Sequence, residues 1–565
     1  MAKKLLLILF FLNILILRAL SQNTDDDPRL REIVLEYGQA AVSMPLPGIG
    51  ALSKISRMVS VDIVKDKSVR IIISPLTVDW FIGQKFNYKI LDRPDSKGIT
   101  MAASVCKAME WDSYPAYSQY DSIMQGFMEN YPDLCRVDTI GYSNYGKLVL
   151  ALKVSDNAAV DEDEPEVFYS STIHGDETGG FVLMLHLADY LLKNYNSSPE
   201  VKELVDNLEI WINPLANPDG TYKTGNTISS PVRFNANGYD LNRNFPDPET
   251  PNTVKQRETL DMIAFMRKHR FVISANFHAG SEVVNYPWDR WPRLHADNDW
   301  FYSVSRRYAD TAHANSFPGY LTDEDDGITN GYAWYQINGG RQDFVTYELQ
   351  GREVTIELDQ DKETPAANLL SLWEYNYPSL LEYLENALYG IHGSVYDAVT
   401  GESVPARIEI KDHDKDSSQV DSDTLSGSFV RLIAPGTWNI LFTADGYIDK
   451  TVDNVNVTDG QRTDLEVAMV HFTNPVDTVK TPVIRIYPDP ATDYIKVLLP
   501  ERQTGKVNVA IFNSVGMKVI DYNTDTFDDI PLYITVTSLG SGVYSIVITN
   551  TATGISDKSR FIITH

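Results

Sequence analysis

Residues 101–388 contain short apolar segments typical of buried β-strands, and segments with helical periodicity separate them. Four of the apolar segments are "EVFYSSTI", "LEIWINPLA", "FVISANFHA" and "EVTIELD". A strand that is apolar along its whole length is buried on both faces, which requires helices on both sides of a largely parallel or mixed sheet. We therefore predict an α/β domain over residues 99–388, with a mixed sheet flanked by helices.

The 565-residue chain is too long for one domain, because a single hydrophobic core stops growing at roughly 250–300 residues. Residues 22–98 combine strand-like runs with a helical patch at 52–58, which predicts a small α/β module and a candidate pro-segment. After residue 389 the helical periodicity is lost, and apolar residues alternate with polar ones around glycine-rich turns. This pattern predicts a β-sandwich at 389–470, a polar linker at 471–484 and a second strand-rich module at 485–565.

The first 21 residues have the composition of a signal peptide. Lys3 and Lys4 precede an apolar stretch at 5–17, and Ala19 and Ser21 supply the small residues of a cleavage site. A membrane anchor is disfavoured, because the stretch is shorter than the roughly 20 residues that span a bilayer and Asn13 interrupts it. No other segment is apolar enough to span, so we expect export through the periplasm to give a secreted or cell-surface protein.

The formal net charge of -28 narrows the class of partner. Nucleic acids and acidic membranes repel an acidic surface and require a basic patch. Neither is expected as a partner, whereas a cationic substrate is compatible with this charge. Cys106 and Cys135 are the only cysteines. An oxidising compartment would let them pair, but two inert buried thiols are an equally good interpretation.

A histidine and a glutamate three residues apart, His174 and Glu177, follow the apolar run "EVFYSSTI" in a glycine-rich turn. His278 follows another apolar run, "FVISANF". Two histidines and one carboxylate are the donors of a catalytic zinc that keeps its fourth position open for water. A surface ion pair and an ordinary histidine at a strand end are the alternatives for these residues.

Glu357 ends the apolar strand segment "VTIE". A carboxylate on such a strand is costly unless it faces a site, and a metal-activated water requires a nearby base. Exposure on an edge strand is the alternative.

Two polar stretches carry groups that suit an anion. "SSPVRFNANGYDLNRNFPD" contains Arg233, Asn242 and Arg243, and "NGYAWYQINGGRQDF" contains Tyr335 and Gln342. A guanidinium donates two parallel hydrogen bonds to a carboxylate, and donors aimed at a developing oxyanion make a large catalytic contribution. Surface ion pairs are the alternative for any single arginine.

These motifs together resemble the zinc metallocarboxypeptidases, and most closely the regulatory subfamily that includes carboxypeptidases D, E, M and N. The resemblance covers residues 101–388 and includes "DLNRNFPD", which is similar to a hallmark of that subfamily. It implies one zinc ion per catalytic domain and a peptide substrate with a free C-terminal carboxylate. The implied roles are zinc ligands at His174, Glu177 and His278, a general base at Glu357, an oxyanion donor at Arg233, a carboxylate grip at Asn242 and Arg243, and a mobile tyrosine at Tyr335.

The resemblance also implies a preference for C-terminal lysine or arginine. Members with that preference have an aspartate and a glutamine at the positions of Asp289, in "NYPWD", and Gln342, in "GGRQD". A loop ion pair of Asp289 with Arg290 or Arg293 is the alternative. Two other functions remain open for the chain as a whole: a zinc amidase of the same fold acting on cell-wall peptides, and an inactive surface-binding protein.

The two C-terminal segments carry resemblances of their own. Residues 389–470 are similar to the transthyretin-like β-sandwich that follows the catalytic domain in this subfamily, through "GSVYDAVTGESVPARIEI" and "TADGY". The final module resembles the C-terminal sorting domain by which Bacteroidetes-type bacteria export proteins, through "YPDPATDYIKV" and "GVYSIVI". That resemblance implies the secretion machinery as a partner.

Overall fold

The structure is a computed structural model that describes residues 26–65, 67–92, 98–249, 254–472, 484–527 and 530–564. The expected signal peptide at 1–21 and the linker residues 473–483 lie outside the described residues. The chain divides into two compact units, Met1–Phe472 and Thr473–His565, which are described separately below.

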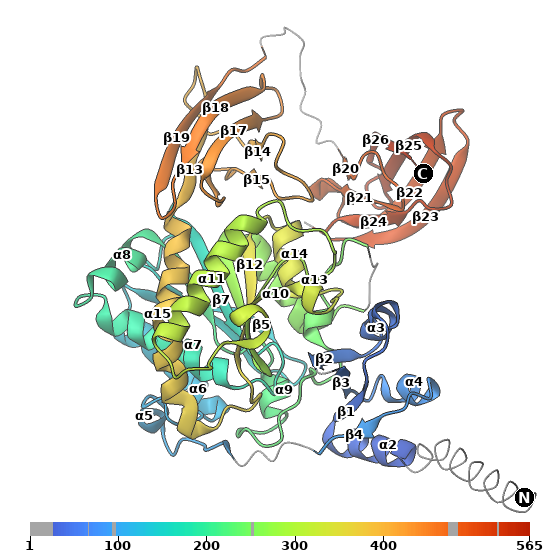
Figure 1. Cartoon of the computed structure of the whole chain (residues 1–565). Helices are drawn as coiled ribbons and strands as arrows, with labels where there is room; N and C mark the ends of the chain where they lie inside the picture. Colours follow the sequence, from blue (N-terminus) through green and yellow to red (C-terminus); the bar gives the residue numbers. More distant parts are fainter. Residues whose placement is uncertain are drawn as a thin grey trace, which may run out of the picture. The chain divides into compact units, whose positions relative to one another are not determined.

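An eight-stranded mixed sheet forms the centre of the first unit, and its strands β5, β7 and β12 are labelled in Figure 1. The strand order is β11-β10-β12-β9-β7-β8-β6-β5. The four central strands β12, β9, β7 and β8 are parallel. The strands β5 and β6 pair antiparallel with their neighbours, and β10 pairs antiparallel with β12 but parallel with β11. The sheet confirms the predicted mixed α/β fold. Its strands are β5 (Cys135–Tyr142), β6 (Leu148–Val154), β7 (Glu166–Ser171), β8 (Glu209–Asn213), β9 (Phe271–His278), β10 (Ser281–Tyr286), β11 (Ile328–Asn330) and β12 (Arg352–Asp359).

Helices cover both faces of this sheet. The strand residues Phe168 and Tyr169 are adjacent but belong to different buried clusters, one on each face. Figure 1 shows α15 running beside α7 and α11, and these helices pack together. The helices are α5 (Val105–Ala108), α6 (Tyr117–Asn130), α7 (Gly179–Asn194), α8 (Pro199–Asn207), α9 (Pro218–Tyr222), η2 (Leu241–Arg243), α10 (Arg257–Lys268), α11 (Asn298–Ala314), α12 (Asp323–Asp326), α13 (Gly331–Trp334), α14 (Arg341–Glu348), η3 (Ala366–Asn368), α15 (Leu369–Glu385) and η4 (Asn386–Leu388).

The N-terminal residues form a small antiparallel sheet with three helices, in the strand order β2-β3-β1-β4. The elements are α2 (Asp26–Tyr37), β1 (Ala40–Pro45), α3 (Ile49–Ser56), β2 (Ser60–Lys65), β3 (Ser68–Ile73), α4 (Val78–Gly83) and β4 (Lys89–Ile90). We call residues 26–92 the N-terminal module. Its apolar core also contains Tyr335 and Ile337 from the large domain, so the module packs directly on that domain.

Two further sheets enclose one apolar core after residue 389, which is the β-sandwich arrangement. Asp297 of the large domain, wholly buried, accepts hydrogen bonds from Arg352, from Arg431 of the sandwich and from His413 of the sandwich. This network joins the two parts. The strands are β13 (Gly390–Asp397), β14 (Arg407–Ile410), β15 (Val420–Asp421), β16 (Ser428–Arg431), β17 (Gly436–Thr443), β18 (Lys450–Val457) and β19 (Arg462–Met469).

The second unit has its own apolar core between a three-stranded sheet, β20-β21-β24, and a four-stranded sheet, β23-β22-β25-β26. It is all-β apart from one helical turn, η5 (Glu501–Gln503), among its described residues. The strands are β20 (Arg485–Tyr487), β21 (Tyr494–Leu498), β22 (Gly505–Asn513), β23 (Lys518–Thr526), β24 (Leu532–Thr535), β25 (Gly542–Asn550) and β26 (Ser556–Ile563).

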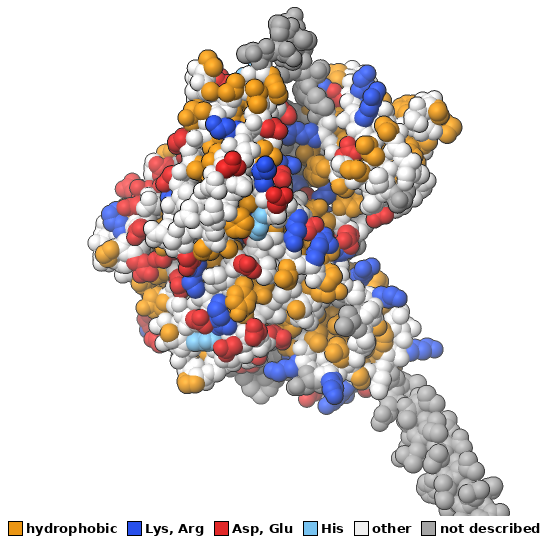
Figure 2. All heavy atoms as spheres, turned by 45° about the horizontal axis from the view of Figure 1, so that its top comes forward, with side chains coloured by type: hydrophobic (Ala, Val, Ile, Leu, Met, Phe, Trp, Pro, Cys, Tyr) orange, Lys and Arg blue, Asp and Glu red, His pale blue; other side chains and the backbone are white. Residues whose placement is uncertain are grey.

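Three further features were expected from the sequence: the charge of the surface, the lack of a membrane span and the state of the cysteines. Figure 2 shows acidic and basic side chains interspersed over the visible face. No helix in the described part of the chain has the length and apolar character needed to cross a membrane. Cys106 is exposed, Cys135 is buried and the two are not bonded to each other. Burial raises the pKa of the Cys135 thiol to about 12, which makes it unreactive.

Candidate metal centre and substrate cleft

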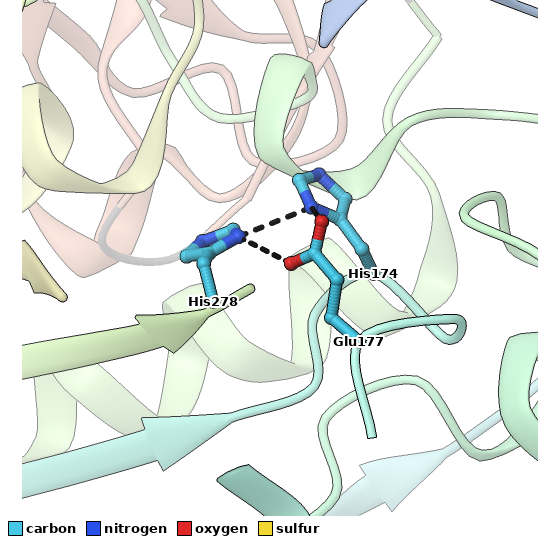
Figure 3. A group of neighbouring side chains, drawn as sticks. All are labelled: His174, Glu177 and His278. Carbon is cyan, nitrogen blue, oxygen red and sulfur yellow. Dashed lines mark hydrogen bonds and ion pairs between the residues drawn. The ribbon is translucent and has the colours of Figure 1, made fainter. Parts of the chain in front are cut away.

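Three side chains that could hold a metal ion meet where two adjacent parallel strands end. His174 and Glu177 lie in the turn between β7 and α7, and His278 is the last residue of β9. The carboxyl ends of parallel strands lie at one edge of a sheet, so these side chains are brought together although 101 residues separate Glu177 from His278. Figure 3 shows the three side chains pointing toward one another.

The turn that carries the first two donors depends on close backbone packing. A Cβ atom on Gly175 would lie 2.4 Å from the Gly220 Cα, which is closer than real Cβ atoms come. A side chain at this position would push His174 away from the strand edge. Glycine beside the histidine is therefore a structural requirement of the turn.

The donor atoms have the separations that one ion requires. His174 Nδ1 lies 3.0 Å from Glu177 Oε1 and 3.1 Å from His278 Nδ1, and His278 Nδ1 lies 2.8 Å from Glu177 Oε2. Donors at about 2.0–2.1 Å from a tetrahedral zinc would lie roughly 3.3 Å apart. All three side chains are at most 3% exposed. The residues fit a zinc ion with one position left open.

Outer hydrogen bonds orient both rings. Asp240 Oδ1 lies 3.1 Å from His174 Nε2 and accepts its proton, which leaves Nδ1 free to bind a metal. Asn276 Nδ2 lies 2.7 Å from His278 Nε2, and Asn276 Oδ1 has no hydrogen-bond partner among the described residues. With that amide turned by 180°, Oδ1 would accept an Nε2 proton and Nδ1 would remain for the metal; the more distant Asn242 Nδ2, 3.4 Å from the same Nε2, would then have to turn away.

The charges of the donors also suit a metal. Burial raises the pKa of Glu177, but the nearby His174 and Lys362 outweigh this effect and hold it well below its usual range. Burial lowers the pKa of His278 to about 4. The glutamate is therefore ionised and His278 neutral near pH 7, which are the protonation states that bind metal.

Glu357 lies beside the metal donors, because β12 pairs with β9 and places Glu357 opposite His278. Its Oε2 atom is buried and has no hydrogen-bond partner within the described ranges. Burial and the charge of Glu177 raise the pKa of Glu357 well above its usual value. A carboxylate that lines the cavity, has one buried oxygen without a partner and is easily protonated has the properties of a general base.

The predicted anion-binding groups lie close together in the sequence. Arg233 lies on the loop before η2, and Asn242 and Arg243 lie in η2. Arg233 Nε donates to Asp240 Oδ2 at 2.9 Å, and Arg233 Nη1 lies 3.5 Å from Glu177 Oε1. Arg243 Nη1 donates to the Asn242 carbonyl at 2.9 Å, whereas Arg243 Nε has no hydrogen-bond partner in the part of the chain that the structure describes. Arg243 therefore retains a donor for a ligand.

Asp289 forms the acidic end of the cleft. Its Oδ1 atom accepts hydrogen bonds of 3.0 Å from Asn285 Nδ2 and from Gln342 Nε2. Burial raises the pKa of Asp289 to about 6. The arginines considered as alternative partners are engaged elsewhere: Arg290 with Asp247 and Glu249, and Arg293 with Asp416.

One cavity of ≈ 20 Å³ joins these groups. Nine of the ten sequence-predicted site residues line it, and the tenth, Gln342, lies behind Asp289. Tyr335 is 8% exposed, and burial raises its pKa to about 12.

The sequence analysis missed four residues of this site. Asp240 lies inside the quoted motif "DLNRNFPD" and Asn285 inside "NYPWD", so proximity to these motifs was an available signal. Lys362 Nζ lies 3.2 Å from Glu177 Oε1, and Asp62 lines the cavity from the N-terminal module. No pattern in the sequence marks these last two residues.

The fold and the site together define an α/β protein in which a buried His-Glu-His group at the strand ends could hold a metal ion. Residues 120–379 match the zinc carboxypeptidase family. Carboxypeptidase M of Mus musculus is 33% identical over 351 residues, which cover 58% of this chain and 77% of that protein. The carboxypeptidase N catalytic chain of Homo sapiens is 34% identical over 365 residues, which cover 57% of this chain and 78% of that protein.

The chain therefore belongs to the zinc carboxypeptidase family. Carboxypeptidase D of Homo sapiens is 34% identical over 360 residues, which cover 60% of this chain but 26% of that longer protein. The chain thus corresponds to about a quarter of carboxypeptidase D. Residues 485–564 match a second family, the secretion system C-terminal sorting domain, as the sequence predicts.

Proposed function

We propose that the chain is a zinc-dependent carboxypeptidase that removes C-terminal lysine or arginine from peptides and proteins. The observation that carries this proposal is one cavity lined by three potential metal donors, by Glu357, whose Oε2 atom has no partner among the described residues, and by the buried Asp289 carboxylate. Family membership supports the same reaction.

Cleavage at the chain end follows from the position of the anion-binding groups. Arg243 and Asn242 would bind the α-carboxylate of the substrate through the free Arg243 donor. A substrate held by its terminal carboxylate presents only its last peptide bond to the metal donors. The same anchor explains why an internal peptide bond would not be cut.

The chemical step uses the groups around the metal donors. A zinc ion held by His174, Glu177 and His278 would polarise the scissile carbonyl and lower the pKa of water. Glu357 would take the proton of the attacking water and deliver it to the leaving amine. Arg233 would donate to the oxyanion, and Tyr335 would cover the bound terminal residue.

The preference for a basic residue comes from Asp289. A lysine or arginine side chain next to this carboxylate would form a desolvated ion pair, held in register by Asn285 and Gln342. An acidic or apolar side chain would leave the carboxylate without a counter-charge.

The test is the release of terminal residues from peptides that end in lysine, arginine, leucine or glutamate, with and without a zinc chelator. We expect lysine and arginine to be released fastest, the chelator to stop release and added zinc to restore it. Faster release of leucine than of lysine or arginine would contradict the proposed basic pocket. Release that is unchanged by the chelator would contradict the proposed zinc-dependent function. Equal cleavage of a C-terminally amidated peptide would favour a zinc amidase instead.

We further propose that the signal peptide at 1–21 directs the chain into the periplasm and that the C-terminal unit engages the secretion machinery. The match of residues 485–564 to the sorting domain supports the second step. A chain truncated after Phe472 should therefore be retained in the periplasm, which fractionation of producing cells would measure.

A further inference from the structure

A buried carboxylate beside the basic pocket holds the backbone that carries Asp289. Asp343 is the third residue of α14 and is 5% exposed. Its Oδ1 atom accepts the Asp289 backbone N–H at 3.0 Å, and its Oδ2 atom accepts the Arg290 backbone N–H at 2.9 Å. We call residues 287–290, which follow β10, the pocket loop. Both oxygens of Asp343 are therefore engaged with this loop.

The two residues before Asp343 hold neighbouring parts of the site. The Arg341 backbone N–H donates to Asn242 Oδ1 at 2.9 Å, and Gln342 Nε2 donates to Asp289 Oδ1 at 3.0 Å. The first turn of α14 thus contacts the proposed carboxylate grip, the Asp289 side chain and the Asp289 backbone.

A buried ion pair fixes the same turn to the central sheet. The side chains of Arg341 and of Glu353 on β12 are wholly buried, and Arg341 Nη2 lies 2.9 Å from Glu353 Oε2. The Ser274 hydroxyl of β9 donates to the same oxygen at 2.8 Å. The strands that carry His278 and Glu357 therefore also set where α14 begins, and a support built on strands holds a side chain more precisely than a free loop does.

Further contacts of the pocket loop come from the segment that carries Tyr335. Gln336 and Ile337, just after Tyr335, donate to backbone carbonyls of the pocket loop at 2.9 Å and 3.2 Å. If Tyr335 moves over a bound terminal residue, these two contacts move with it. Asp343 lies outside that segment, so its hydrogen bonds can keep the pocket loop in place during the movement.

The charge of Asp343 is costly at this position. Burial and the neighbouring charge of Asp289 raise the pKa of Asp343 well above its usual value. An asparagine would avoid this cost, but it offers one acceptor, and its NH₂ group would face an N–H group of the pocket loop. An ionised carboxylate accepts both N–H groups, which gives the costly charge a purpose.

We propose that Asp343 is a positioning residue of the basic pocket, which fixes the Asp289 backbone and thereby the selectivity for a terminal arginine or lysine. The inference rests on the proposed function for the identity of the substrate. In this role Asp343 makes no contact with the substrate and acts through Asp289. If the pocket loop were less well held, the affinity for a basic side chain would fall with the fraction of chains that keep Asp289 in place.

The test compares Asp343→Asn with the wild type on peptides that end in arginine or in leucine. Losing one hydrogen bond to a buried N–H should lower kcat/KM for the arginine peptide by about 5-fold to 100-fold, mainly through KM. The leucine peptide should change little. The control Asp310→Asn, on α11 and 62% exposed, should behave like the wild type. Equal losses on both peptides would overturn the inference, because a merely structural role affects both.

A double variant tests whether Asp343 acts through Asp289. Once Asp289→Asn is in place, Asp343→Asn should cause no further loss of preference for arginine over leucine. A further loss as large as that of the single variant would overturn the positioning role. The affinity for free arginine, measured by calorimetry, needs no turnover and should fall in Asp343→Asn by a similar factor. If it does so in a chain that releases no residue, the positioning role stands and the proposed reaction is rejected.

A measurement on the wild type covers the case in which Asp343→Asn does not fold. The backbone N–H groups of Asp289 and Arg290 should exchange slowly with solvent, with and without saturating arginine, because both donate to Asp343. Exchange of either amide at the rate of an unstructured peptide in saturating arginine would show that Asp343 does not hold the pocket loop.

Discussion

The basic pocket gives the most direct test of the proposed specificity, through the substitution Asp289→Asn. Asp289 is 3% exposed, and its Oδ1 atom accepts hydrogen bonds from two amides, Asn285 and Gln342. Asparagine has nearly the same size but carries no charge. The substitution therefore removes the attraction for a basic side chain while it keeps the volume of the pocket.

The burial of Asp289 allows the expected loss of kcat/KM to be estimated. Removing one partner of a desolvated charge pair costs about 2–5 kcal/mol. At about 1.4 kcal/mol for each factor of ten, kcat/KM for a peptide ending in arginine should fall by roughly 30-fold to several thousand-fold. A peptide ending in leucine makes no ion pair with Asp289, so its kcat/KM should change little.

The assay measures both peptides with the wild type, with Asp289→Asn and with the control Asp310→Asn. Asp310 lies on α11, where it is 62% exposed and pairs with Arg306 at the surface. A basic buffer is required, because burial raises the pKa of Asp289 to about 6 and the wild-type carboxylate must be ionised. Equal losses on the arginine and leucine peptides would refute the reasoning, since a loss shared by both is structural.

Three further outcomes are expected. Glu357→Gln should lower turnover by about 10²–10⁴-fold while the bound zinc, measured by metal analysis, stays unchanged; wild-type turnover would reject Glu357 as the base. KM for an arginine peptide should fall as the pH rises through about 6, because Asp289 is uncharged below this pKa, and the pH profile of KM measures it. This dependence should vanish in Asp289→Asn. Asp297→Asn should lower the free energy of unfolding in urea by about 3–5 kcal/mol, because it removes the ion pair of the buried Arg352 and one of the two ion pairs of the buried Arg431, whereas a stability equal to that of Asp310→Asn would contradict this.

Strand ends explain why much of the metal centre was predictable. The apolar runs that end near His174, His278 and Glu357 identify β7, β9 and β12 from local sequence alone. These strands are neighbours and parallel, so their carboxyl ends must lie at one edge. The step from three separate motifs to one site therefore needed only strand pattern and sheet topology.

Residues that reach the site from another part of the chain are not marked by any sequence pattern. Asp62 lies in "SVDIVK", which predicts a strand but not its docking on a domain that begins after residue 98. Lys362 follows β12 in a polar segment, where a lysine is ordinarily exposed. The free Cys106 and Cys135 likewise depend on distances in the folded chain. Periodicity reports which face of an element is buried, not which other element covers it.

Docking of the module changes how the cleft must be interpreted. Residues of the N-terminal side of the chain contact several groups of the site: the Val61 carbonyl accepts from Arg243 Nη2, Asp62 pairs with Lys362, and Gln39 accepts the Arg233 amide. Buried cations and amides without partners would destabilise the fold, so a cleft closed in this way gains stability until a substrate replaces each contact. A substrate carboxylate would take the place of the Val61 carbonyl at Arg243, whereas Lys362 keeps its ion pair with Glu177 of the large domain.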